Sequence, residues 1–191
     1  MKKIILSACI TLTLTTAQSI IGPGNTKTNL FNFLINNYKT SSTLSYNSAR
    51  DVMYSIIDLT SDNTLKGIYT NYTITIDPTQ DPRPQTNALN MNCEHSWPQS
   101  MGASGSPQKS DMHHLYPSRG NVNSSRGNKP FDEINDIQTD KWWRLDYYET
   151  SIPNQFIDEF SEVDNDNEKF EPREDVKGNI ARSMFYFYTI Y

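Results

Sequence analysis

The chain has 191 residues, which is enough for one ordinary domain with a sizeable core, and its formal net charge is −5. An acidic balance argues against a protein that coats nucleic acid with its whole surface, because phosphate contacts need cations. The only cysteines are Cys9 and Cys93, so a small fold stapled by several disulfides is excluded.

Residues 1–17 are typical of a signal peptide. Lys2 and Lys3 give a positive start, and the apolar stretch 4–14 that follows is too short to span a bilayer. A buried N-terminal strand or helix is the alternative. We expect the chain to be exported, either secreted or periplasmic, and residues 18–191 to form a single domain.

Hydrophobic periodicity predicts two helices and a strand in the first half of the mature chain. An amphipathic helix is expected over 30–38. A second helix, capped within 45–48, would carry four apolar side chains on one face: Val52, Met53, Ile56 and Ile57. Apolar residues alternate with threonines over 69–76, which is typical of a strand, and three prolines within 77–87 indicate a loop.

The second half mixes aromatic and acidic stretches. We expect a core cluster from five residues: Trp142, Trp143, Leu145, Tyr147 and Tyr148. Residues 159–175 are acidic and indicate a solvated connection, and the aromatic stretch 180–191 predicts a closing helix. The fold class expected from these elements is α+β, with a mixed helical body.

The charge is distributed unevenly along the chain. Residues 132–175 hold 15 acidic and 4 basic side chains, whereas residues 94–130 hold 2 acidic and 4 basic ones. All three histidines, His95, His113 and His114, fall in the second window. This mildly basic window is therefore where a polyanion would bind.

Glu94 and His95 are neighbours, and on a strand their side chains would point to opposite faces. A carboxylate could then reach a cation while a neutral imidazole reaches a water molecule, and imidazole is a suitable base near pH 7. The alternative is a surface glutamate beside a structural histidine.

A second polar cluster contains Asp111, His113 and His114. The alternation over 111–116 fits a short strand, and Pro117 is well placed to start a helix.

Asn123 and Arg126 lie three residues apart, so on such a helix both would face the same site. An ordinary surface loop is the alternative interpretation of this stretch.

One carboxylate and one amide oxygen make a lightly charged metal site. Such a site suits Mg²⁺, which prefers oxygen ligands and keeps its waters, with Mn²⁺ or Ca²⁺ as alternatives. Arg126 offers a fork for a phosphate. Zinc is a rival, because four possible zinc ligands lie in this region: Cys93, His95, His113 and His114.

Three segments together resemble the endonuclease I family, which are secreted or periplasmic nucleases of the ββα-metal (His-Me finger) superfamily. The family pattern reads E-H-x-x-P, S-D-x-H-x-L-x-P and G-x-V-N-x-x-R-x-N. The chain matches it with EHSWP at 94–98, SDMHHLYP at 110–117 and GNVNSSRGN at 120–128. A fainter match continues at 177–182, where the family has a basic-Gly-x-x-Ala-Arg helix.

The resemblance implies a role for each matched residue. His95 would be the general base, and Glu94 and Asn123 would be the two protein ligands of the cation. The resemblance also implies that two strands and a helix carry this site. Asp111, His113 and the neighbouring His114 would support the site geometry.

The chain departs from the family pattern in two places. Some relatives have a long insertion with a phosphate-clamping arginine, but here only residues 96–109 separate the first two segments, and they contain no arginine. Arg119 or Arg126 could take its place, although a structural role is the alternative for Arg126. Relatives usually continue past the Ala-Arg helix, so residues 18–191 could lack the family's C-terminal segment.

The sequence thus predicts an exported, sequence-nonspecific endonuclease that acts on DNA, with RNA as a second substrate, and that works as a monomer. Nothing in the chain supplies readout of bases, such as a basic recognition helix. A phosphodiesterase acting on small nucleotides and an exported binding protein without catalytic activity are the alternatives.

Overall fold

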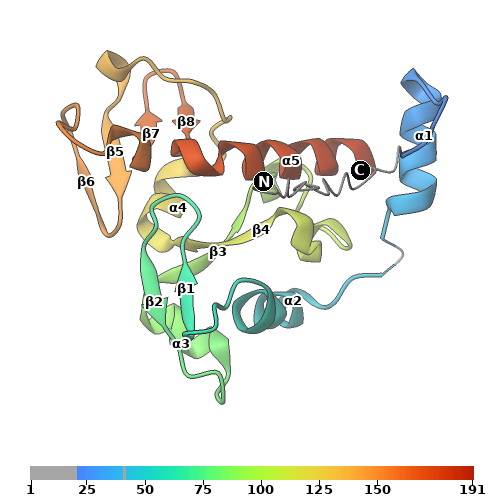
Figure 1. The fold of residues 1–191 in the computed structure, drawn as a ribbon, viewed down its shortest axis with the longest axis horizontal. Helices are drawn as coiled ribbons and strands as arrows, with labels where there is room; N and C mark the ends of the chain where they lie inside the picture. The colour runs from blue at the N-terminus through green and yellow to red at the C-terminus, as the bar shows by residue number, and fades with distance from the viewer. Residues whose placement is uncertain (1–20, 41) are drawn as a thin grey trace, which may run out of the picture.

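The computed structural model describes residues 21–40 and 42–191, which form helices and three small sheets in an α+β arrangement (Figure 1). The predicted signal peptide lies outside the described residues. In the part of the chain that is described, no helix is long and apolar enough to cross a membrane.

Two helices open the described chain. Helix α1 (Lys27–Tyr38) confirms the first predicted helix, but none of its residues is buried. It lies at one end of the last helix, α5 (Glu174–Ile190), where the rings of Phe31 and Tyr188 meet edge to face with centroids 6.0 Å apart (Figure 1). Helix α2 (Tyr46–Val52) begins as predicted, because the Ser45 side chain accepts a hydrogen bond from the Ser48 N–H.

The buried face of the second helix differs from the prediction. Helix α2 continues into a π-helical turn, Met53–Ile57, whose wider winding shifts the side chains away from the 3.6-residue period. Ala49, Met53 and Tyr54 are therefore buried, whereas Ile56 is 71% and Ile57 56% exposed.

Strands β1 (Thr64–Lys66) and β2 (Thr73–Thr75) pair antiparallel. The strand predicted over 69–76 is shorter than expected, because its first half forms the turn between them. The Gly67 N–H donates to the Tyr72 carbonyl at 2.8 Å, and Asn71 has a positive φ of 58°. Asparagine tolerates this left-handed conformation better than most residues do.

The loop predicted over 77–87 is wrong in its second half, which is helix α3 (Pro82–Ala88). The Asp81 side chain accepts a hydrogen bond from the Arg83 N–H at 3.0 Å, and Pro82 occupies the first helical position. Proline is favoured there, because its missing N–H would have no partner within the helix.

Strands β3 (Met91–His95) and β4 (Leu115–Arg119) form an antiparallel hairpin, and helix α4 (Gly120–Arg126) follows directly. The predicted strand over 111–116 and the predicted helix start at Pro117 are both displaced. Met112–His114 form a 3₁₀ turn, and Pro117 lies within β4, opposite Cys93.

Strand register explains why a proline is tolerated there. The Ser96 N–H donates to the His114 carbonyl, and the Gly120 N–H donates to the Asn90 carbonyl. Hydrogen-bonded pairs alternate along an antiparallel ladder, so Pro117 occupies a position where an N–H would point away from β3.

The third sheet has the strand order β6-β5-β7-β8. Its strands are β5 (Lys141–Arg144), β6 (Tyr147–Glu149), β7 (Ser161–Asp164) and β8 (Lys169–Glu171). The predicted aromatic cluster is only partly core: Trp142 and Trp143 are buried, but Leu145, Tyr147 and Tyr148 are each more than a third exposed.

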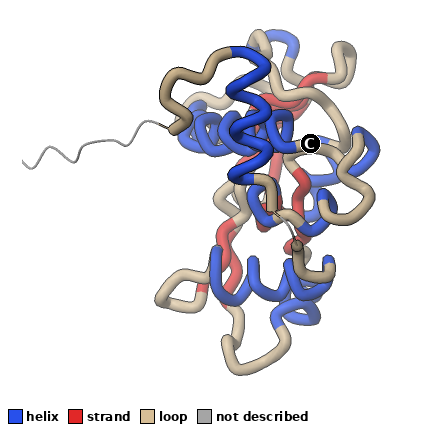
Figure 2. Tube along the Cα trace, turned by 90° about the vertical axis from the view of Figure 1, so that its right-hand side faces the viewer, coloured by secondary structure: helices blue, strands red, loops and turns tan. Residues whose placement is uncertain are grey.

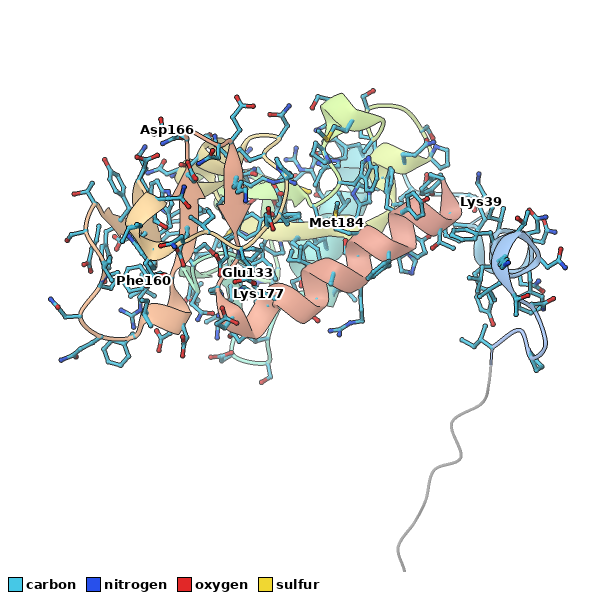
Figure 3. The ribbon with its side chains drawn as sticks, turned by 90° about the horizontal axis from the view of Figure 1, so that it is seen from above. Lys39, Glu133, Phe160, Asp166, Lys177 and Met184 are labelled. Carbon is cyan, nitrogen blue, oxygen red and sulfur yellow. The ribbon has the colours of Figure 1, made fainter. Side chains whose placement is uncertain are left out.

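The solvated acidic connection predicted over 159–175 is wrong, because it forms β7 and β8. Glu162 and Glu171 are only 7% and 6% exposed. Lys177, from the first turns of α5, reaches Glu171 Oε1 at 2.6 Å and Glu133 Oε1 at 2.8 Å; Lys177 and Glu133 lie side by side in Figure 3. A buried carboxylate is tolerated when it is paired in this way.

The hairpin β3–β4 and helix α4 connect two hydrophobic cores. One core packs α2, β1 and β2 against the hairpin, with Met91 and Leu115 as the contributions of β3 and β4. The other core packs the third sheet and α5 around Val122 of α4. Strands β3 and β4 cross the molecule between α5 on one side and α2 on the other (Figure 1), and the view in Figure 2 likewise shows strands between an upper and a lower group of helices. The segment that carries the predicted site is therefore fixed from both sides.

Candidate active site

Two strands and one helix frame the site. Glu94 and His95 end strand β3, and Asn123 lies in the middle of α4. The first residue of α4, Gly120, lies so close to the hairpin that a Cβ there would collide with the Asn90 side chain. A glycine at this position thus permits the tight passage from β4 into α4.

A pocket of about 240 Å³, here called the Glu94 pocket, brings together the three residues predicted for catalysis and metal binding. Glu94, His95 and Asn123 all line it. The remaining wall is formed by Cys93, Pro98, Gln99, Ser100, Arg126, Gly127 and Asn128. The hairpin and the helix therefore place a carboxylate, an imidazole and an amide around one space.

The His95 ring is held by a backbone atom. Its Nε2 lies 3.0 Å from the Lys109 carbonyl oxygen, which can only accept, so Nε2 carries the proton of the neutral ring. Nδ1 is then the basic nitrogen. Gln99, which also lines the Glu94 pocket, has its Nε2 3.5 Å from Nδ1, so the basic nitrogen lies on the pocket side.

Burial, helped by the neighbouring His114 and Lys109, lowers the pKa of His95 to about 4, although the hydrogen bond to the Lys109 carbonyl acts to raise it. The ring is consequently neutral at pH 7, as a proton acceptor must be. The imidazole packs between the rings of Tyr46 and His114, with centroids 5.5 and 5.3 Å away.

Glu94 is held at one oxygen. Its Oε1 accepts a hydrogen bond from the Tyr69 hydroxyl at 2.6 Å and lies 3.1 Å from Arg126 Nη1. Burial raises the pKa of the Glu94 carboxyl to about 7, although Arg126 and Tyr69 both act to lower it. Because these contacts use Oε1, they do not occupy Oε2.

Arg126 serves a structural role in place of the expected phosphate fork. Its side chain is only 2% exposed. Besides Glu94, the guanidinium donates to the carbonyls of His95 at 3.2 Å and Ser96 at 2.8 Å, and it stacks on Phe131. These contacts engage both terminal nitrogens of the guanidinium, so Arg126 positions the end of β3.

Arg119 also lies away from the expected position. It pairs with Met91 at the opposite end of the hairpin from His95, and its guanidinium stacks on the Tyr72 ring at 4.4 Å. It does not line the Glu94 pocket. The structure therefore does not place Arg119 near the residues that it was expected to assist.

The polar cluster at 111–114 supports the segment that orients His95. The Asp111 carboxylate accepts hydrogen bonds from Tyr186 at 2.8 Å and Tyr191 at 2.7 Å, both at the C-terminal end of the chain, and from His113 Nδ1 at 2.8 Å. His114 is fully buried, and its Nε2 lies 2.7 Å from the Gln108 carbonyl.

Consecutive carbonyls, Gln108 and Lys109, thus hold the rings of His114 and His95. His113 instead points outward, with a side chain that is 65% exposed and stacked on Tyr186.

The donor set fits a hard cation better than zinc. Among residues 21–40 and 42–191, no three His, Cys, Asp or Glu side chains are grouped closely enough to hold a metal. Cys93 is a poor ligand here, because burial raises the pKa of its thiol to about 12. Glu94 and Asn123 would supply two oxygens and leave space in the pocket for water and a phosphate.

Sequence reasoning missed the groups that orient the site. Tyr69 holds Glu94 from 25 residues away in the sequence, and no local pattern marks it. The acceptor for His95 is the main-chain oxygen of Lys109, which no residue type reveals. Tyr46, whose ring contacts His95, lies at the start of the predicted second helix, but nothing in the sequence indicated that it would reach the site.

The sequence comparisons are consistent with this arrangement. A family model described as Endonuclease I matches residues 23–191. The protein named Extracellular ribonuclease from Bacillus subtilis (strain 168) is 34% identical over 107 residues, which cover 55% of this chain and 31% of that protein. Its namesake from Bacillus amyloliquefaciens is 33% identical over 102 residues, covering 52% of this chain and 29% of that protein.

Each match spans less than a third of the relative, whereas the family model spans most of this chain. The matched residues include strand β3 and helix α4, which both line the Glu94 pocket. The chain belongs to the endonuclease I family.

Proposed function

We propose that this protein is an exported, sequence-nonspecific endonuclease that hydrolyses phosphodiester bonds of DNA and RNA with a divalent cation. One observation carries the proposal: a neutral imidazole, fixed through Nε2, has its basic Nδ1 at a pocket that a carboxylate and an amide share. The names of the relatives support both export and the inclusion of RNA.

In this proposal the hairpin and α4 are the ββα-metal motif of the family. Glu94 and Asn123 would hold the cation, Mg²⁺ in the first instance and Mn²⁺ or Ca²⁺ as alternatives. When bound, the cation would supply positive charge against the charge that develops on the phosphoryl oxygens and the leaving oxygen. Tyr69 and Arg126 hold the Glu94 carboxylate in place.

His95 acts as the general base. Its Nδ1 removes a proton from a water molecule, whose oxygen forms a bond to phosphorus as the bond to the 3′ oxygen breaks. The leaving oxygen takes up a proton from solvent, and the products carry 5′-phosphate and 3′-hydroxyl ends. Contacts to phosphate and sugar carry no sequence information directly, which supports cleavage without sequence preference.

Plasmid nicking tests this function directly. We expect nicking with Mg²⁺, none with EDTA, and a rate about 10²- to 10⁴-fold lower for His95→Ala. A parallel assay on single-stranded RNA measures the second substrate. Hydrolysis of small nucleotide diesters without any nicking would favour the phosphodiesterase, and no hydrolysis of either would favour a binding protein.

A further inference from the structure

A second pocket adjoins the Glu94 pocket. Its volume is about 280 Å³, and it shares two wall residues, Cys93 and Asn123, with the Glu94 pocket. The rest of its wall consists of Tyr46, Arg50, Tyr54, Asn87 and Asn92, and we name it the Arg50 pocket. Because both pockets border Asn123, a chain molecule bound in one lies next to the other.

The Arg50 side chain is a cation without a carboxylate partner. Among the described residues, no Asp or Glu oxygen lies within 4.0 Å of it, and its Nε is shielded from solvent without a hydrogen bond. The other half-buried or buried arginines Arg83, Arg126, Arg144 and Arg173 each have a carboxylate. Arg119 has none among the described residues either, but unlike Arg50 it lines neither pocket. A shielded cation left unpaired in this way favours an anion as its partner.

The Arg50 pocket contains no acidic residue that would repel an anion. Asn87 and Asn92 are exposed amides on its wall, and amide N–H groups can donate to phosphate oxygens. The planar guanidinium of Arg50 suits bidentate contact with a phosphate. The chemistry of the pocket therefore matches a phosphate group better than a base or a sugar.

Helix α2 ties this pocket to the general base. Tyr46 lies one turn before Arg50, and the guanidinium stacks over the Tyr46 ring at 5.4 Å. The same ring contacts His95, with centroids 5.5 Å apart, and has the Lys109 ammonium 4.8 Å from its centre. The position of Arg50 is thus fixed relative to His95.

We propose that the Arg50 pocket binds a backbone phosphate next to the scissile one, with Arg50 as its main contact. The proposal rests on the proposed nuclease function, because it needs a polynucleotide in the Glu94 pocket. Arg50 is a substrate-binding residue in this scheme, and it supplies the phosphate contact that neither Arg119 nor Arg126 provides.

The decisive test is the salt dependence of DNA binding by the full chain in EDTA, where no cleavage occurs. Each phosphate neutralised adds about 0.9 to the slope of log K against log salt. Arg50→Met should therefore weaken binding of a DNA duplex about 10- to 100-fold and reduce the slope by about 1. Arg182→Met removes an equal charge from an exposed site on α5 and should leave the slope unchanged.

Cleavage kinetics give a second readout. A contact made equally before and during the reaction changes KM and leaves kcat unchanged. Arg50→Met should therefore raise KM for DNA about 10-fold or more at an unchanged kcat, and Arg50→Lys should recover part of the loss. Far-UV circular dichroism and thermal unfolding check that each variant is folded.

Two results would overturn the proposal: an unchanged salt slope in Arg50→Met, or a loss confined to kcat. Failure of the proposed function looks different. Wild-type protein would then nick no DNA with Mg²⁺, whereas the binding experiment in EDTA would still report whether Arg50 contacts phosphate.

Discussion

Arg126 Nη1 lies 3.1 Å from Glu94 Oε1, and both side chains are at most 3% exposed. The same guanidinium holds the main-chain carbonyls of His95 and Ser96. One buried cation thus fixes the orientation of the carboxylate and the path of the chain immediately after it. Removing it would leave Glu94 as an uncompensated buried charge.

Replacing Arg126 with methionine should destabilise the fold by about 3–5 kcal/mol, because it breaks a buried ion pair and leaves two carbonyls without donors. Urea unfolding followed by tryptophan fluorescence measures the change. Arg144→Met is the matched control: its partner Glu159 is 44% exposed, so the loss should stay below about 1 kcal/mol. Equal effects in the two variants would contradict a structural role for Arg126.

Glu94→Gln and Asn123→Ala should each raise the Mg²⁺ concentration that gives half-maximal nicking by at least about tenfold, because each removes a proposed ligand. His95→Ala should lower the rate without moving this concentration. A Mg²⁺ titration of nicking rates with all three variants checks both statements. If Asn123→Ala left the titration unchanged, Asn123 would not be a ligand.

Asp111→Asn should reduce stability near neutral pH and have no effect in strong acid. Burial would raise the pKa of Asp111, but hydrogen bonds from His113, Tyr191 and Tyr186 outweigh it and hold the pKa below its usual value. A depressed pKa in the folded state stabilises the protein above the unfolded pKa, and this contribution disappears as the pH falls through the folded pKa. Urea midpoints of wild type and variant between pH 2 and pH 7 should therefore converge at the acid end.

Glu162→Gln should show the opposite pH dependence. Burial in β7 raises the pKa of Glu162 to about 7, so the folded state binds its proton more tightly than the unfolded state does. That contribution is complete below the unfolded pKa and is lost as the pH rises through about 7. The variant should be the more stable protein at pH 8, on the order of 2 kcal/mol. A wild type that is equally stable at pH 5 and pH 8 would contradict this pKa.

The sequence predicted the chemistry of the site better than its surroundings. Glu94, His95 and Asn123 were recognisable because they belong to short segments whose order and spacing are specific, and the structure places all three around one pocket. The roles of Arg119 and Arg126 could not be read in the same way. An arginine in such a segment can bind either a phosphate or a buried carboxylate, and only the packing around Glu94 distinguishes these two roles.

The errors in the fold have similar physical causes. Acidic composition suggested a solvated stretch, yet Lys177 pairs with Glu171 of β8 and also with Glu133, which lies 44 residues away in the sequence. Three prolines suggested a loop where α3 lies, although an aspartate followed by proline is also a helix start. Pro117 suggested a helix start, whereas strand register lets it lie in β4 at no cost in hydrogen bonds.

The carbonyl that orients His95 has a consequence for mutational studies. Every residue offers the same peptide oxygen, so an alanine scan would pass over position 109 with little loss, and a deep mutational map would show it as tolerant. Only a change to the main chain itself, such as a one-residue insertion between 99 and 109, would displace the acceptor and misorient the ring. Sites of this kind constrain the length of a loop far more strongly than its composition.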